Sequence, residues 1–229
     1  MPPKAKFSRE EIVQAGLAIV REEGLSGLTA RALGARLGSS ARPVFTVFSG
    51  MEEVESAVIA AARAVYSAYV REGLAEAVPF RGVGKQYIRF AVREPRLFQL
   101  LFMQEAEGDL KGILPAIEEH YAEILQSVRD SYGVDGETAE GLYCHLWIYT
   151  HGIAALCATG TCRFTEAEIV RMMGEVMAGL LRLHRPKTAG EASRAAAEES
   201  GETARAPAGS GQETARNGSK NDGRKEEAP

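Results

Sequence analysis

Few cysteines occur in this sequence, and their number argues against a disulfide framework. Three are present among 229 residues, at Cys144, Cys157 and Cys162, whereas disulfide-stabilised secreted domains carry more cysteines in shorter chains. A signal peptide is also not expected, because residues 1–11 contain lysines with no apolar segment behind them. Both absences favour a protein of the reducing cytoplasm.

The sequence also lacks the residue spacings of catalytic and metal sites. Cys144 is followed directly by His145, and Cys157 is separated by four residues from Cys162, whereas zinc ligands usually come in tighter pairs. A glycine-rich phosphate loop and a nucleophile beside a base are both missing. We therefore expect no enzyme, no metal and no cofactor, and we expect His120 to lie at the surface.

One long segment has no charged residue at all. It spans residues 141–162, which is long enough to cross a bilayer. The segment nevertheless contains two histidines, three threonines and three glycines, a polar content that is untypical of a membrane span. The expected structure is a buried helix of a soluble protein, with no membrane partner.

Charge is unevenly distributed along the chain. The whole sequence has a formal net charge of −4, but residues 1–50 carry seven basic and four acidic side chains. A basic N-terminal part attached to an acidic remainder indicates that only the N-terminal part meets a polyanion.

Helical periodicity and helix caps extend over most of the sequence and predict an all-α fold. Ser8 followed by Glu11 is a capping box for a first helix that ends at Gly24. Thr29 can cap a short second helix with Gly38 as its stop. Further helices are expected from Met51 onward and near residues 80–93, 95–106, 115–132, 137–159 and 165–183, with a break at Gly108.

The last part of the sequence lacks large apolar side chains. Residues 187–229 contain no Val, Ile, Leu, Met, Phe, Tyr, Trp or Cys. Such a segment cannot bury enough apolar surface to offset the entropy lost on ordering. We therefore predict a disordered tail at residues 186–229, after an N-terminal domain at residues 1–50 and a helical body at residues 51–185.

The segment LGSSARPVFTVF at residues 37–48 combines a strand-like composition with a helical context. Its second half is β-branched or aromatic, but no partner strand is predicted elsewhere. A helix capped by Ser40 accommodates Pro43 as its third residue, because that position has no intrahelical N–H bond to lose. The sequence thus predicts a helix over residues 40–47. Its apolar side would hold Val44, Phe45 and Phe48.

Two short helices joined by a glycine turn form a helix-turn-helix. The second helix of such a motif can enter the major groove of DNA, and its first turn can present backbone N–H groups to phosphates. The predicted N-terminal part is therefore a three-helix DNA-binding domain.

Three short motifs surround this predicted recognition helix: TxxxL at residues 29–33, LGSS at residues 37–40 and VFxxF at residues 44–48. Together they resemble the DNA-binding signature of the tetracycline-repressor (TetR) family. The chain departs from the family at three positions, and polar side chains that the family uses on the DNA backbone are absent there. Phe45, Val47 and Met51 stand where Tyr, His and Lys are usual.

The later part is similar to one branch of the same family. EPRLF at residues 94–98 and LWIYTHG at residues 146–152 resemble the motif of its effector domain, and the whole resemblance covers roughly residues 8–184. It implies that the body binds a small effector and forms a dimer. The helices near residues 137–159 and 165–183, with broad apolar faces and small residues, are the expected homodimer interface.

The DNA-contact candidates surround the predicted recognition helix. Arg42 is expected on its first turn, where it contacts either a guanine edge or a phosphate. Thr46 contacts a thymine methyl or a phosphate, and Phe45 either packs on the sugar–phosphate edge or belongs to the core. The full set is Lys4, Lys6, Thr29, Arg31, Ser40, Ala41, Arg42, Pro43, Phe45 and Thr46.

The effector-pocket candidates are the aromatic and neighbouring side chains of the body. The family resemblance implies a pocket there, and the alternative is that these side chains only fill the core. The set is Tyr66, Tyr69, Tyr87, Phe90, Phe102, Met103, Tyr143, Trp147 and His151.

The predicted function is that of a homodimeric transcriptional regulator, a repressor that a small-molecule effector releases from a palindromic DNA operator. The alternative is an architectural DNA-binding protein without an effector. Lack of any cavity in the body would favour that alternative.

Overall fold

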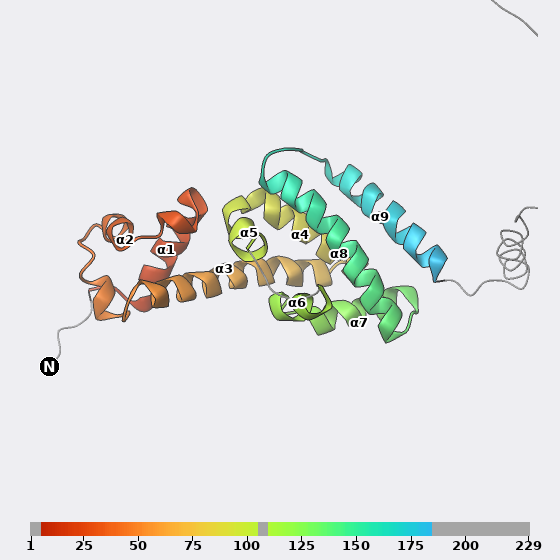
Figure 1. The fold of residues 1–229 in the computed structure, drawn as a ribbon, viewed down its shortest axis with the longest axis horizontal. Helices are drawn as coiled ribbons and strands as arrows, with labels where there is room; N and C mark the ends of the chain where they lie inside the picture. Colours follow the sequence, from red (N-terminus) through yellow and green to blue (C-terminus); the bar gives the residue numbers. More distant parts are fainter. Residues whose placement is uncertain (1–5, 105–109, 185–229) are drawn as a thin grey trace, which may run out of the picture. The chain divides into compact units, whose positions relative to one another are not determined.

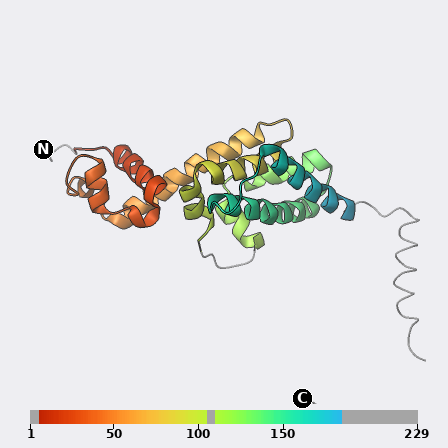
Figure 2. The ribbon, with the colours of Figure 1, turned by 90° about the horizontal axis from the view of Figure 1, so that it is seen from above.

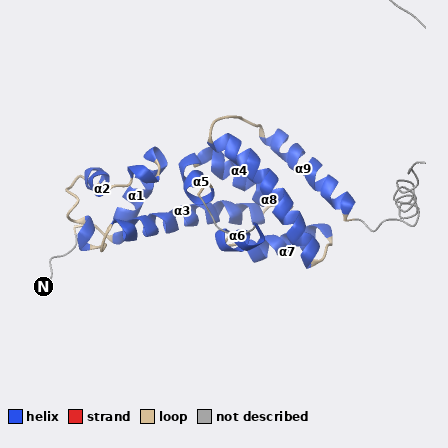
Figure 3. Ribbon diagram, viewed as in Figure 1, coloured by secondary structure: helices blue, strands red, loops and turns tan. Residues whose placement is uncertain are grey.

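The described part of the chain consists of helices and the turns between them. The structure is a computed structural model that describes residues 6–104 and 110–184, and no strand occurs in these ranges (Figure 3). This confirms the all-α expectation. In chain order, with η for 3₁₀ helices, the elements are α1 (Arg9–Glu23), η1 (Leu25–Gly27), α2 (Ala30–Arg36), η2 (Val44–Thr46), α3 (Met51–Leu74), α4 (Pro79–Arg93), α5 (Pro95–Phe102), α6 (Leu110–Ile117), α7 (Tyr121–Tyr132), α8 (Gly136–Ala158) and α9 (Glu166–Leu183) (Figure 1).

The first two helices begin where the sequence predicts. The Glu11 N–H donates to Ser8 Oγ at 3.2 Å, and the Ser8 N–H donates to the Glu11 carboxylate at 2.7 Å. The Ala32 N–H donates to Thr29 Oγ1 at 3.2 Å. These bonds satisfy N–H groups that a helix start leaves without an intrahelical partner, and they confirm the two predicted caps.

The predicted helix over residues 40–47 is wrong. Only Val44–Thr46 are helical there, in the 3₁₀ element η2. The Val44 N–H donates to the Ala41 carbonyl at 3.1 Å, instead of to the Ser40 carbonyl as an α-helix requires. β-branched and aromatic side chains lose rotamer freedom in a helix, and so short a stretch forms too few bonds to offset helix nucleation.

The tighter turn also changes which side chains face the core. Val44 is 0% and Phe48 is 2% exposed, whereas Phe45 is 44% exposed. With three residues per turn, neighbouring side chains point in directions about 120° apart. The prediction that Phe45 lies on the apolar side is therefore wrong, and its ring is on the surface.

The helical body is assembled around α4. This helix contacts α3, α5, α7, α8 and α9. The start of α4 approaches α3 closely at Gly73. A Cβ at that position would lie only 2.6 Å from the Val83 nitrogen, so only glycine permits this approach. The helices α8 and α9 lie side by side (Figure 2).

Two predicted helices of the body have different bounds in the structure. The helix expected at residues 95–106 ends at Phe102, and the break expected at Gly108 lies outside the described residues. The helix expected at residues 115–132 is interrupted after Ile117, and α7 begins at Tyr121. The backbone N–H of His120 there donates to a side-chain carboxylate at 3.1 Å instead of to a helical carbonyl.

The uncharged segment of the sequence belongs to α8. Leu142, Tyr143, Leu146 and Thr150 are each buried on it, as expected for a helix packed inside the body. Within residues 6–104 and 110–184, no helix is long and apolar enough to cross a membrane. The predicted tail at residues 186–229 lies outside the described residues, and the domain boundary at residues 50 and 51 stays a prediction.

Candidate DNA-binding surface and effector cavity

Most of the DNA-contact candidates lie on the surface around η2. Lys6 Nζ donates to Ser39 Oγ at 3.1 Å, so the segment before α1 lies next to the turn that follows α2. Lys4 lies outside the described residues. The exposed candidates are Lys6, Thr29, Arg31, Ser40, Arg42, Phe45 and Thr46, and the half-buried ones are Ala41 and Pro43.

Two arginines on this surface are available to DNA. Residues 6–50 contain five arginines, and Arg31 and Arg42 are the two that form no hydrogen bond or ion pair with another described residue. Both are exposed, so neither has to break an intramolecular bond to contact a phosphate or a base. The other three form the ion pairs Arg9–Glu53, Arg21–Glu94 and Arg36–Glu22.

The two threonines differ in the hydrogen-bonding capacity that they retain. Thr46 Oγ1 donates its proton to the Pro43 carbonyl at 2.7 Å. Thr29 Oγ1 accepts the Ala32 N–H, so its own O–H proton can still be donated. Phosphate oxygens only accept hydrogen bonds. The geometry therefore favours a phosphate contact for Thr29 and a thymine-methyl contact for Thr46.

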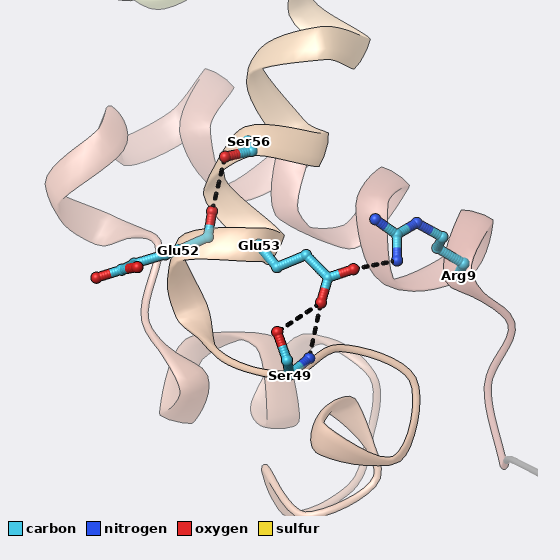
Figure 4. A network of polar contacts seen from close by, with 5 residues as sticks. All are labelled: Arg9, Ser49, Glu52, Glu53 and Ser56. Carbon is cyan, nitrogen blue, oxygen red and sulfur yellow. Dashed lines mark hydrogen bonds and ion pairs between the residues drawn. The ribbon is translucent and has the colours of Figure 1, made fainter.

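A polar network fastens the start of α1 to the start of α3 (Figure 4). The Glu53 carboxylate accepts from Arg9 Nη1 at 2.7 Å and from the backbone N–H and hydroxyl of Ser49, each at 2.8 Å. The Arg9 guanidinium also lies 4.2 Å from the centre of the Phe48 ring. Because Phe48 and Ser49 follow η2 after a single residue, Val47, the network holds the chain that leaves this turn.

We expect Glu53→Gln to destabilise the N-terminal part most at neutral pH. Hydrogen bonds from Ser49 and then Arg9 lower the pKa of Glu53 from 4.5 to about 2. Ionised Glu53 therefore stabilises the fold fully above pH 4.5, and this stabilisation is lost as the pH falls toward about 2. Denaturant unfolding of wild type and variant from about pH 3 to about pH 7 measures the difference. Glu52→Gln is the matched control, and a destabilisation by Glu53→Gln that does not vary with pH would contradict the expectation.

Most of the effector-pocket candidates gather around Tyr87. Its ring centre lies 5.2 Å from that of Phe102, 6.0 Å from that of Tyr66 and 6.3 Å from that of Trp147. The Tyr87 hydroxyl lies 2.9 Å from His151 Nδ1, and Trp147 stacks on His151 with ring centres 4.8 Å apart. The structure therefore joins α3, α4, α5 and α8 through one aromatic cluster.

The remaining candidates lie at the edges of this cluster. Phe90 is buried, with its ring centre 5.3 Å from those of both Tyr66 and Tyr69. Tyr143 is 4% exposed. Met103 is 43% exposed and stands on the surface just after α5.

A small cavity lies within the cluster. Its volume is about 20 Å³, which is enough for one water molecule. Four of the candidates line it, together with a carboxylate that the sequence analysis missed. The lining residues are Tyr66, Phe80, Val83, Gly84, Tyr87, Glu118, Tyr143, Leu146, Trp147 and Thr150.

Glu118 is the missed polar group, and His120, two residues later, is another residue whose position differs from the expectation. The Tyr66 hydroxyl donates to Glu118 at 2.5 Å, and burial raises the pKa of Glu118 despite this bond. His120 Nε2 lies 2.7 Å from Ser67 Oγ and its Nδ1 lies 3.0 Å from a Glu123 oxygen. The side chain of His120 is 11% exposed, so the expected surface position is wrong. Acidic neighbours in the sequence make this segment resemble a solvent-exposed turn.

Two larger clefts involve α4 and α9. One has a volume of about 330 Å³ and lies along the C-terminal half of α4 and the first turn of α9. The other has a volume of about 410 Å³ and lies between the start of α4, the end of α7 and α9. None of the effector-pocket candidates lines either cleft. The described body thus contains cavities. A lack of cavities would have favoured a purely architectural role, so that argument does not apply.

Comparisons with known proteins agree with this architecture. The family model for the tetracyclin repressor-like C-terminal domain matches residues 80–180. The uncharacterised HTH-type transcriptional regulator Rv0681 of Mycobacterium tuberculosis is 28% identical over an alignment of 194 residues, and the match covers 82% of this chain and 88% of the relative. The chain is thus similar, over most of its length, to a helix-turn-helix transcriptional regulator. Over residues 80–180 the chain is similar to the C-terminal domain of tetracyclin repressor-like (TetR) regulators.

Solved structures show the same fold. The TetR regulator SCO7222 of Streptomyces coelicolor superposes with a TM-score of 0.56 at 21% identity, over 79% of this chain and all of its own. A transcriptional regulator of Rhodococcus sp. RHA1 superposes with a TM-score of 0.54 at 16% identity, over 77% of this chain and 97% of its own.

Proposed function

We propose that this regulator is a homodimeric repressor that leaves a palindromic operator when a small molecule binds its body. The observation that carries the proposal is the course of α4. This helix lines the aromatic cavity with Tyr87, and the residue after its end, Glu94, accepts two hydrogen bonds from Arg21 of α1 at 2.9 and 3.0 Å. A ligand that displaces α4 therefore acts on the DNA-binding part through the bidentate ion pair between Glu94 and Arg21.

Arg31 and Arg42 supply the main cationic contacts with DNA in this proposal. Both are exposed, and so is the Phe45 ring on η2. Phe45 replaces the tyrosine that is usual in the family, so its ring packs on the sugar–phosphate edge without donating a hydrogen bond. Arg42 then provides base discrimination, and Arg31 and Thr29 position the protein on phosphates.

The homodimer forms through α8 and α9. Ile148 is 56% and Leu156 is 39% exposed, and Gly152 lies midway between them on the same face of α8. Leu183 near the end of α9 is 80% exposed. An apolar stripe with a glycine at its centre suits close packing of a second copy, and the resulting two-fold symmetry matches a palindromic site.

Arg42→Ala tests the proposed DNA contacts. An operator is first selected from random duplex DNA with the full chain, and affinity is then measured by fluorescence anisotropy. We expect the variant to bind the selected operator more weakly by about 1–3 kcal/mol, and unrelated DNA only slightly more weakly. Arg129→Ala, an exposed arginine of α7, is the control. If Arg42→Ala binds every sequence as wild type does, the assignment of Arg42 is wrong.

The repressor and effector parts of the proposal are tested on the same operator. Compounds that bind the body are expected to lower the affinity of the protein for its operator. In a reconstituted assay, the protein bound at an operator beside a promoter is expected to block transcription. An operator affinity that no bound compound changes would support the architectural alternative instead.

A further inference from the structure

Glu118 is a buried acid with no basic partner among residues 6–104 and 110–184. It is 4% exposed and lies between α6 and α7. It accepts hydrogen bonds from the Tyr66 hydroxyl at 2.5 Å and from the His120 N–H at 3.1 Å. Its carboxylate forms no ion pair with a basic side chain among the described residues. Buried carboxylates are normally paired, and the described residues supply no cation to Glu118.

The cavity beside Glu118 has walls that suit a cation. Five of its ten lining residues are aromatic, Glu118 is the one charged residue, and none is basic. Aromatic ring faces carry a negative potential that attracts a cation within about 6 Å of the ring centre. Burial, and then the charge of Glu118, raise the pKa of Tyr143 on the opposite helix, so the field of the carboxylate extends across the cavity.

We propose that this cavity binds an organic cation, whose substituted ammonium head pairs with Glu118 while its apolar body packs on Tyr87, Tyr143 and Trp147. The inference rests on the proposed function, because it assigns a chemical class to the effector of the same site. An anionic ligand would add a second negative charge beside a buried carboxylate. A neutral ligand would remove solvent from Glu118 without supplying a counter-charge.

The cavity must widen to admit such a ligand. A volume of about 20 Å³ holds one water molecule but no substituted ammonium group. Trp147 is half-buried on α8, and its ring centre lies 6.3 Å from that of Tyr87 on α4. A cation that enters between these rings separates α4 from α8. The binding step thus produces the displacement of α4 that release from DNA requires.

Trp147 provides a direct measurement, because it is the one tryptophan of the 229 residues. The probes are phenyltrimethylammonium and its uncharged carbon isostere, tert-butylbenzene, which have nearly the same shape. Each is titrated into the full chain while tryptophan fluorescence is recorded. We expect saturable quenching by the cation, with an affinity at least about tenfold above that of the isostere. Equal affinities for the two probes, or no saturable quenching by the cation, would overturn the proposal.

Charge-removing variants locate the interaction. Glu118→Gln is expected to lower cation affinity at least about tenfold and to leave the isostere within about twofold of wild type. Glu119→Gln removes the same charge from the exposed neighbour and should change neither probe. Tyr66→Phe keeps the ring and the carboxylate, so the preference for the cation should persist. Thermal unfolding of each variant shows that it is folded, and a preference for the cation that survives in folded Glu118→Gln would refute the assignment.

The failure of this inference and the failure of the proposed function are distinguishable. Operator affinity is measured with each probe, and also with a panel of neutral and anionic aromatic compounds. If a neutral or anionic compound quenches Trp147 and releases DNA while the cation does neither, the ligand class is wrong and the release mechanism stands. If the cation binds at Glu118 and operator affinity is unchanged, the ligand class stands and the release mechanism is wrong.

Discussion

Gly34→Ala is expected to lower operator affinity by at least about tenfold while the helical body stays folded. Gly34 lies in α2, and a Cβ there would meet backbone atoms at 2.8 Å, namely the Ala41 nitrogen and the Ser40 carbonyl carbon. Backbone cannot rotate aside as a side chain can, so the turn that carries Arg42 must shift. Overpacking of this kind costs about 1–3 kcal/mol, which exceeds the gain of about 1 kcal/mol in helix propensity.

Gly50→Ala is the matched control for this experiment. Gly50 precedes α3 with extended backbone, and a Cβ there meets nothing within 4 Å. The control should bind the operator as wild type does, and circular dichroism should report the same helix content for both variants. Wild-type affinity in Gly34→Ala would mean that the contact of α2 with residues 39–41 does not determine where the DNA-binding surface lies.

Phe48→Ala and Phe45→Ala are expected to affect different properties. The first should lower stability, and the second should lower operator affinity. Phe48 is 2% exposed and packs under Arg9, so its truncation should reduce the free energy of unfolding by about 3–5 kcal/mol. Phe45 is 44% exposed, so its truncation should change stability by about 0.5 kcal/mol or less. Operator affinity should fall in Phe45→Ala, because the lost ring belongs to the DNA-binding surface.

Both variants remove the same atoms from residues three positions apart, so each controls for the other. Denaturant unfolding gives the stability difference, and anisotropy on the selected operator gives the affinity. If Phe45→Ala is as destabilised as Phe48→Ala, the result would contradict the exposed position of Phe45 and support the helix predicted over residues 40–47, with Phe45 on its apolar side.

Sequence patterns predicted the elements whose local signals agree with their packing. Ser8 and Thr29 each cap a helix in the structure, because a hydroxyl at that position bonds N–H groups of the first turn without any help from distant residues. A period of 3.6 residues fixes which side of a helix faces the core. The buried residues that follow it include Val54, Val58 and Ala62 on α3 and Ile169, Met173 and Met177 on α9.

The η2 turn and Glu118 could not be predicted because their structure depends on distant residues. Whether residues 40–47 form an α-helix or a tighter turn depends on how α2, through Gly34, approaches their backbone. Glu118 is buried because Tyr66, 52 positions earlier, donates to it. Charge and composition predict exposure for an acidic residue followed by Glu119 and His120, and tertiary packing overrides that local signal.

The close contact of α3 with the start of α4 gives α4 a fixed point about which the helix could rotate. A Cβ on Gly73 or Gly82 would clash with backbone atoms, so the start of α4 has no room to slide along α3, and the proposed mechanism places the movement at the other end of α4. At 1.5 Å per residue, Tyr87 lies about 7.5 Å and Glu94 about 18 Å from Gly82 along the helix. A displacement of about 1 Å at Tyr87 would therefore become one of about 2.4 Å at Glu94. In the proposed mechanism, the ion pair between Arg21 and Glu94 would pass this longer movement to α1, so a small shift of the Tyr87 ring would be enough to move the DNA-binding surface.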